Sequence, residues 1–399
     1  MAEICDTVLD AFFLSLPVSL LARTSRMAID IGGSLAKYVV CPDEEWRRAE
    51  NQNLAVANCT CLTFPRDAIG AAADVILSLM TPSTGREVFA TGVGSTEFRA
   101  EIESKFGIRI KIQYEIDEVV RGLLFTLRHL SLVDVVHPVE INLQLINSLV
   151  DINSKYVDLH DAGVLTWKCH RLIEGYADDQ MKTLCQPPQI NDRTFPCIVA
   201  MCGSMHGYQL VQLDGSYSAH DVDYMGGKTL LGLSSLLLGT QDFKAILRMA
   251  SEGNAARVDL TDADFSSSSN DADDPYSAVF SSSAPSAMFL PFAKISEQNK
   301  DAIAKEDIAA SLLNLFVVKL VDSVRSAVAA TKVGDVFLCG SFVNFEQMRK
   351  KIAVEIQRRD ILFFTFNGQH LNFNLHFLRH AAYLCSLGML VSQADEAMK

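Results

Sequence analysis

Several signatures of well-known protein classes are missing from this sequence of 399 residues. Its ten cysteines include no C-x-x-C pair and its nine histidines include no H-E-x-x-H, so neither a disulfide framework nor a zinc site is predicted. We expect reduced thiols, packed as small apolar side chains in a cytoplasmic protein. Positive charge is also scarce: 35 Lys and Arg against 48 Asp and Glu give a net charge of −13, which argues against a nucleic-acid partner.

Two further absences concern membranes and nucleotides. The apolar run at residues 11–22 is too short to span a bilayer, and Glu3, Asp6 and Asp10 precede it where a signal peptide would carry positive charge. We therefore expect residues 1–25 to form an apolar N-terminal extension with a packing or partner-binding helix, and no membrane span. The sequence has neither the P-loop pattern G-x-x-x-x-G-K-[ST] nor a strand-linked G-x-G-x-x-G, so a nucleotide would require a different fold.

What is present is an apolar chain with an internal repetition. Hydrophobic residues make up 49% of the sequence, and its length suits two lobes. The stretch 28–40, AIDIGGSLAKYVV, predicts two strands joined at a glycine turn, and residues 196–211 repeat that layout. A strand followed by glycine and a helix is predicted at 87–102 and again at 335–349. The repetition predicts two similar α/β lobes, residues 26–195 and 196–399.

The glycine turn of the first hairpin has a carboxylate before it and a lysine after it. A turn without side chains lets a polyphosphate approach backbone N–H groups. Asp30 could then hold Mg²⁺ through water, with Lys37 one short strand from the phosphates. A plain hairpin, in which the glycines supply positive φ, explains a single copy equally well. The second copy favours a nucleotide clamped between two lobes.

These residues resemble a known family. The segments DIGGSLAK, ATGVGSTEF, EIDEVVRGLLF, GSMHG, YMGGKTLLGLSSLLLG, KEDIAASLL and VFLCGSFVN occur in the order seen in eukaryotic-type (type II) pantothenate kinases. The resemblance runs from Arg26 to about Val391 and implies the two-lobe actin-like ATPase fold. It also implies ATP- and Mg²⁺-dependent phosphorylation of pantothenate to 4'-phosphopantothenate, the first step of coenzyme A biosynthesis, in a dimer subject to feedback by coenzyme A or its thioesters.

Carried onto this sequence, the resemblance implies a role for particular residues. Glu115 is implied as the catalytic base, with Asp117 a weaker neighbour; a solvent-facing carboxylate that suits a helix start is the other explanation of Glu115. The implied nucleotide-binding residues are Asp30, Gly32, Gly33, Ser34 and Lys37 in the first phosphate loop, Gly203 and Ser204 in the second, Gly226 and Gly227 in the glycine-rich segment, and Gly340 in the adenosine-side turn.

The sequence departs from the family pattern on the substrate side. Gly207 ends a changed G-S-G-x-S motif, and Ala219 stands where the family has an arginine that helps to hold the substrate carboxylate. His220 or Lys228 could supply a replacement cation. Two alternatives to a self-sufficient pantothenate kinase therefore stay open. One is a weak or inactive subunit that regulates or completes the site of a related kinase in a heterodimer; the other is a sugar or acyl kinase with a neutral substrate.

Overall fold

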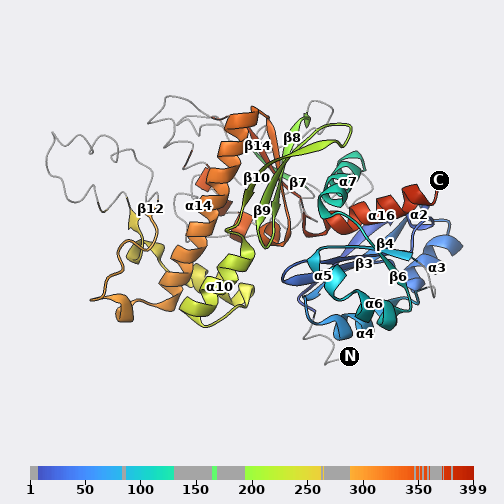
Figure 1. Ribbon diagram of the computed structural model, residues 1–399, viewed down its shortest axis with the longest axis horizontal. Coiled ribbons are helices and arrows are strands. Elements are labelled where there is room, and N and C mark those ends of the chain that lie inside the picture. Colours follow the sequence, from blue (N-terminus) through green and yellow to red (C-terminus); the bar gives the residue numbers. More distant parts are fainter. Residues whose placement is uncertain are drawn as a thin grey trace. The chain divides into compact units, whose positions relative to one another are not determined.

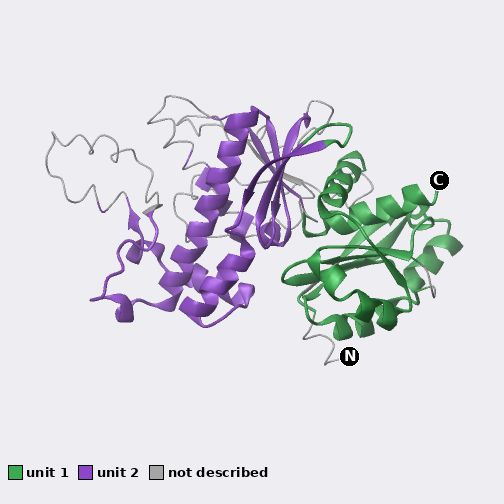
Figure 2. Ribbon diagram, viewed as in Figure 1, with its two compact units in different colours: residues 1–137, 211–216, 379–399 green, residues 138–210, 217–378 purple. Residues whose placement is uncertain are grey.

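The computed structural model describes residues 8–82, 87–129, 164–168, 194–261, 264, 288–345, 347–349, 351, 352, 355, 356, 359, 371, 373–378 and 381–399. The chain divides into two compact units (Figure 2). Unit 1 contains residues 1–137, 211–216 and 379–399, and unit 2 contains residues 138–210 and 217–378. The C-terminal segment thus belongs to unit 1, whereas the sequence-based boundaries place it in the 196–399 lobe. Residues 266–274, a serine-rich acidic stretch, and residues 277–283, which the family resemblance implies as a dimerisation segment, lie outside the described residues.

Unit 1 is built on a six-stranded sheet with the strand order β1-β4-β3-β2-β5-β6 (Figure 1). Its strands are β1 (Asp10–Pro17), β2 (Met27–Ile31), β3 (Leu35–Val40), β4 (Val56–Pro65), β5 (Glu87–Thr91) and β6 (Arg109–Ile112). Its helices are α2 (Val18–Leu21), α3 (Asp43–Asn51), α4 (Ile69–Leu79), α5 (Val93–Glu97), α6 (Arg99–Phe106), α7 (Glu115–Arg128) and α16 (Leu384–Glu396).

Unit 2 contains a second six-stranded sheet with the order β10-β9-β8-β13-β14-β7. Its strands are β7 (Val164–Lys168), β8 (Cys197–Cys202), β9 (His206–Val211), β10 (Tyr217–Asp223), β13 (Asp335–Cys339) and β14 (Asn374–Leu378), and β11 (Leu260–Thr261) pairs separately with β12 (Met288–Leu290). The long helix α14 (Lys305–Thr331) packs on β8 and β10, and α10 (Gly227–Leu238) and α11 (Phe243–Glu252) pack on α14.

Five strands of each sheet share one topology, which confirms the predicted α/β class with a β-hairpin in each half, and the sixth strands, β1 and β7, lie at different edges. In each sheet, three strands that are consecutive in the chain lie side by side: β2, β3 and β4 in unit 1, and β8, β9 and β10 in unit 2. Two later strands then continue the sheet on the other side of the first strand and run parallel to it: β5 and β6 beyond β2, and β13 and β14 beyond β8. The glycine after the first of these parallel strands has the same role in both units. Gly92 and Gly340 have φ values of +84° and +102°. A Cβ at either position would lie 2.3 Å from a backbone oxygen of the neighbouring strand, so only glycine fits.

The two faces of the unit 1 sheet carry different side chains. On one face, alternate residues of β2 and β3 form an apolar core with α4 and α6, and Met27, Ile29 and Tyr38 are fully buried there. Helix α16 covers the opposite face, and α7 packs on α16 (Figure 1). Because side chains alternate along a strand, Asp30 and Lys37 point toward the face that α16 covers. The alternation therefore places two charged residues on the side of the sheet where α16 and α7 lie.

The N-terminal segment differs from its prediction. Residues 10–17 form β1, an edge strand antiparallel to β4, and only the four residues of α2 are helical. Leu14 and Leu16 are fully buried while Phe13 is 67% exposed, a period of two rather than 3.6. The expectation of a packing helix in residues 1–25 was wrong for this segment because its apolar residues pair with β4. In the described part of the chain no single helix is long and apolar enough to cross a membrane, although the bent pair α10 and α11 reaches that length and composition together.

Candidate functional site

Asp30 and Lys37 face each other directly across the first hairpin. Their Cα positions are register partners on β2 and β3, and Lys37 Nζ donates to Asp30 Oδ2 at 2.8 Å. Asp30 is only 2% exposed. Burial opposes the charged form of Lys37, but the Asp30 carboxylate and its hydrogen bond outweigh burial, and the pKa of Lys37 lies above its ordinary value. The two charges that flank the glycine turn in the sequence thus form one buried ion pair.

Glu115 is the first residue of α7, as the sequence predicts. The residue is exposed, but nearby protein atoms remove part of the hydration of its carboxylate. This loss of hydration raises the pKa of Glu115, the negative charge of Asp30 raises it further, and Lys37 partly offsets both. Asp30, Lys37 and Glu115 are therefore close enough for their charges to act on one another. A carboxyl with a raised pKa beside a fixed cation is suited to accept a proton near neutral pH.

The surroundings of Asp30 are compatible with a magnesium ion that arrives with a nucleotide. Mg²⁺ usually takes one or two protein carboxylates and completes its octahedron with waters and phosphate oxygens. Asp30 Oδ1 lies beside Gly92, where a Cβ would stand 3.1 Å from this oxygen and 2.3 Å from the Ile31 oxygen, so close packing requires glycine here. No group of three or more acidic, His or Cys ligands gathers anywhere in the described residues. Within the described residues a magnesium ion at Asp30 would therefore take its remaining ligands from phosphate oxygens and water.

The backbone of the first turn does not require glycine for its conformation. Neither Gly32 nor Gly33 has a positive φ, so the plain-hairpin explanation does not hold. A Cβ at Gly32 would meet only the carbonyl oxygen of Leu35, at an ordinary 3.8 Å. The fold would accept a side chain at Gly32, whose N–H donates to the Leu35 oxygen at 2.9 Å, and a turn without one lets a ligand approach the backbone closely. Ser34, the other predicted residue of this loop, follows directly.

In unit 2 the second glycine turn lies against the start of α10. Gly203 and Ser204 accept hydrogen bonds from the backbone N–H groups of Gly227 at 2.8 Å and Lys228 at 3.2 Å. Gly226 is confined, because a Cβ would lie 2.6 Å from the Ser204 oxygen and the Met205 Cα. The structure thus brings four predicted residues, Gly203, Ser204, Gly226 and Gly227, into one cluster. Gly226 has a packing role there, as Gly340 has beside β8.

The substrate-side positions lie on an exposed strand. Ala219 and His220 are exposed on β10, as is Lys228 on the first turn of α10. No Lys or Arg occurs at residues 208–226, and the charged residues of β10 itself, apart from His220, are Asp221 and Asp223. Asp223 accepts from Lys319 on α14 at 3.5 Å and from Ser323 at 3.2 Å. The replacement cation suggested at His220 or Lys228 stays a prediction.

His206, on β9 of the second hairpin, makes stability depend on pH. The ring is fully buried against Phe342, and neither ring nitrogen has a hydrogen-bond partner in the described structure. Burial lowers the pKa of His206 from 6.5 to about 4, with Lys319 adding to the effect and Asp223 opposing it. The unfolded chain therefore takes up a proton that the folded chain refuses as pH falls from 6.5 toward 4.

We expect His206 to reduce the free energy of unfolding by about 2 kcal/mol between about pH 7 and pH 5. His206→Phe keeps an aromatic ring and should remove this part of the pH dependence. His220→Asn, on the exposed face of β10, is the matched control and should leave it in place. Urea unfolding at both pH values measures the difference, and an unchanged pH dependence in His206→Phe would contradict the assignment.

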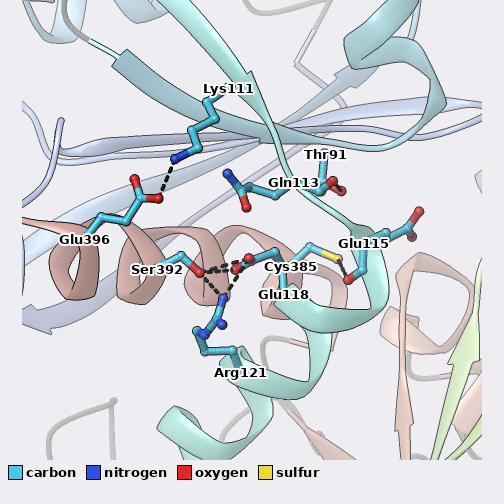
Figure 3. A network of polar contacts seen from close by, with 9 residues as sticks. All are labelled: Thr91, Lys111, Gln113, Glu115, Glu118, Arg121, Cys385, Ser392 and Glu396. Atoms are coloured by element: carbon cyan, nitrogen blue, oxygen red, sulfur yellow. Dashed lines mark hydrogen bonds and ion pairs between the residues drawn. The ribbon is translucent and has the colours of Figure 1, made fainter. Parts of the chain in front are cut away.

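The structure adds residues around Glu115 that the sequence did not single out. Cys385, on α16, donates its thiol to the backbone oxygen of Glu115 at 3.7 Å, and Ser392 donates to Glu118 (Figure 3). Gly92 bounds the space beside Asp30. Only Gly92 had a local signal, since it follows a strand in the repeated strand-glycine-helix pattern. The other contacts depend on where a distant C-terminal helix packs.

Comparison with known proteins agrees with the order of motifs. The family model described as Fumble matches residues 26–392. The chain belongs to the Fumble family. This is the pantothenate kinase family, and the match covers both glycine-turn hairpins and Glu115. The segment that holds most of β1 and α2, residues 10–25, precedes it.

Individual members and structures are distant. The chain is 25% identical to pantothenate kinase 1 of Oryza sativa subsp. japonica over 49% of its length, and 20% identical to the 4'-phosphopantetheine phosphatase of Mus musculus over 94%. It spans 27% and 42% of the lengths of these relatives. Among solved structures, a ROK family protein from Streptococcus pneumoniae TIGR4 gives a TM-score of 0.39 at 10% identity, covering 92% of this chain and 97% of that one. A ROK hexokinase from Thermus thermophilus gives 0.35 at 11%, covering 94% and 99%.

Proposed function

We propose that this member of the Fumble family transfers the γ-phosphoryl group of ATP to the 4'-hydroxyl of pantothenate. The observation that carries the proposal is the group of Asp30, Lys37 and Glu115, in which the carboxyl of Glu115 has a raised pKa beside the buried ion pair of Asp30 and Lys37. Family membership supports the reaction class, and the sterically open turn at Gly32 supports a phosphate ligand.

Each residue has a separate task in this proposal. Glu115 accepts the proton of the attacking hydroxyl as its oxygen bonds to the γ-phosphorus and ADP leaves. Lys37 presents a fixed positive charge, and the glycine turn lets phosphate oxygens approach the backbone without meeting side chains. Asp30 keeps Lys37 protonated and would hold Mg²⁺ with the nucleotide. Mg²⁺, when bound, supplies neutralisation of the phosphate charge.

The direct test is product formation by the purified chain with Mg·ATP and pantothenate. Phosphorylated pantothenate that depends on both substrates is the expected result. Bound Mg·ATP without any product from pantothenate would contradict the proposal for the isolated chain. A panel of neutral alcohols under the same conditions separates a pantothenate kinase from a kinase with a neutral acceptor.

A second function is favoured by one observation. The exposed strand β10 carries Ala219 and acidic residues but no Lys or Arg, although pantothenate is an anion. Loss of a charged hydrogen-bond partner costs about 1.5–3 kcal/mol of binding, or roughly a 10- to 150-fold weaker affinity. On this alternative the chain is a weak or inactive subunit that completes or regulates a related kinase as a heterodimer. It predicts no turnover alone and higher turnover when the related subunit is added.

A further inference from the structure

Helices α7 and α16 touch backbone to backbone. At Gly122 on α7 a Cβ would lie 2.0 Å from the Leu384 oxygen, and at Gly388 on α16 a Cβ would lie 1.9 Å from the Glu118 oxygen. No side chain separates the two helices at this crossing. A displacement of α16 is therefore transmitted directly to the first turns of α7, because no flexible side chain lies between them to absorb it.

A buried polar contact fixes the same crossing. Glu118, on the first turn of α7, is 1% exposed, and its two carboxylate oxygens accept from Ser392 Oγ at 2.9 and 2.7 Å. Arg121 donates to Glu118 at 2.8 Å and also contacts Ser392 (Figure 3). Burial raises the pKa of Glu118, and the bonds from Ser392 and Arg121 oppose that rise. A carboxylate so deeply buried is costly unless its hydrogen bonds are made, so this contact holds the two helices in one register.

The other contacts of α16 reach the remaining parts of the site. Cys385 donates to the backbone oxygen of Glu115, and Gln393 Nε2 donates to the Met27 oxygen at 3.0 Å, at the start of the strand that carries Asp30. Helix α16 is thus bonded both to the helix that begins with Glu115 and to the strand of Asp30. It is the element through which the relative position of these two carboxylates is set.

We propose that Ser392 is a positioning residue for Glu115, acting through its hydrogen bonds to Glu118 across the crossing of α7 and α16. This inference rests on the proposed function of Glu115 as the base. Without the Ser392 hydroxyl, Glu118 loses its hydrogen bonds to α16 and only the weaker thiol contact of Cys385 remains on the first turn of α7, so Glu115 moves relative to Asp30 and to the acceptor hydroxyl. Misplacement of a catalytic group by about 1 Å costs up to about a hundredfold in rate.

The test compares Ser392→Ala with Ser386→Ala. Ser386 lies on the same helix and is fully buried, but its Oγ has no hydrogen-bond partner among the residues described. Both variants lose one buried hydroxyl, and only the first loses the bond to Glu118. Hydrogen exchange of the amides at residues 115–121 reports the position of α7 whether or not the protein is active. Steady-state kinetics against pH report its consequence for catalysis.

We expect Ser392→Ala to lower kcat about 10- to 100-fold with the KM for Mg·ATP unchanged, and to speed hydrogen exchange at residues 115–121. The acidic limb of its rate profile should move toward 4.5, the ordinary pKa of a glutamate, because Glu115 leaves its partly desolvated place near Asp30. Ser386→Ala should change none of these. Wild-type exchange and an unchanged acidic limb in Ser392→Ala would overturn the inference. If Ser392→Ala does not fold, Ser392→Cys is measured in the same way. A wild-type chain without phosphoryl transfer would refute the proposed function instead, and the exchange data would still decide whether Ser392 holds α7.

Discussion

Replacement of Glu115 by Gln is expected to lower kcat for phosphoryl transfer by at least about 100-fold and to leave Mg·ATP binding within about twofold of wild type. General-base catalysis contributes roughly 10²- to 10⁴-fold, and an amide of the same shape cannot accept the proton of the attacking hydroxyl. Nucleotide affinity should persist because Asp30, Lys37 and the first glycine turn are untouched. Steady-state kinetics and calorimetric titration with Mg·ATP measure the two effects separately.

Asp117 provides the matched control for this prediction. It is an exposed carboxylate on the same first turn of α7, two residues after Glu115. Asp117→Asn removes an equal charge from the same helix end, so it reproduces any effect on the helix dipole, which is worth only a few tenths to about 1 kcal/mol. Equal losses in the two variants would show that Glu115 acts through helix stability rather than as a base.

Replacement of Gly388 by Ala is expected to have the largest effect on stability. The added Cβ would lie 1.9 Å from the Glu118 backbone oxygen and 2.9 Å from its Cα, and a backbone atom cannot rotate away as a flexible side chain does. Helices α7 and α16 would have to separate, which breaks the Ser392 bond as well. We expect a loss of about 3 kcal/mol or more in the free energy of unfolding, at the upper end of overpacking effects. Urea unfolding measures it.

The control is Gly232→Ala in the middle of α10. A Cβ at Gly232 meets nothing within 4 Å, so the same substitution in another helix should stabilise the protein by about 0.5–1 kcal/mol through lower unfolded-state entropy. Opposite signs for Gly388→Ala and Gly232→Ala are therefore predicted. A Gly388→Ala protein as stable as wild type would contradict the close helix crossing.

Local features of the fold could be predicted because they are encoded in neighbouring residues. Both hairpins were located from a glycine turn between apolar runs, and the start of α7 at Glu115 from acidic residues ahead of an apolar helical pattern. The pairing of Asp30 with Lys37 could be predicted only with knowledge of the hairpin register, because a shift of one residue would place the two side chains on opposite faces of the sheet. The sequence therefore indicated which residues matter but not that two of them neutralise each other.

The contacts that hold Glu115 in place could not be predicted because they join distant parts of the chain. Ser392 follows Glu118 by 274 residues, and nothing near Gly388 in the sequence indicates that another helix backbone lies against it. The N-terminal segment shows the opposite error. Its apolar run suggested a helix. The segment forms a strand instead, because it lies at the edge of the unit 1 sheet, where β4 supplies its hydrogen bonds.

The most direct test of the account is a single-turnover transfer of the labelled γ-phosphoryl group from ATP to pantothenate, from about pH 4 to pH 8. It is run on wild type and on Glu115→Gln, with Mg·ATP binding measured on the same samples. The account predicts transfer by wild type that falls on the acidic side through a pKa above 4.5, the ordinary value of a glutamate, because burial and Asp30 raise the pKa of Glu115 and only the ionised base acts. Transfer that survives in Glu115→Gln, or bound Mg·ATP with no transfer by wild type at any pH, would contradict it.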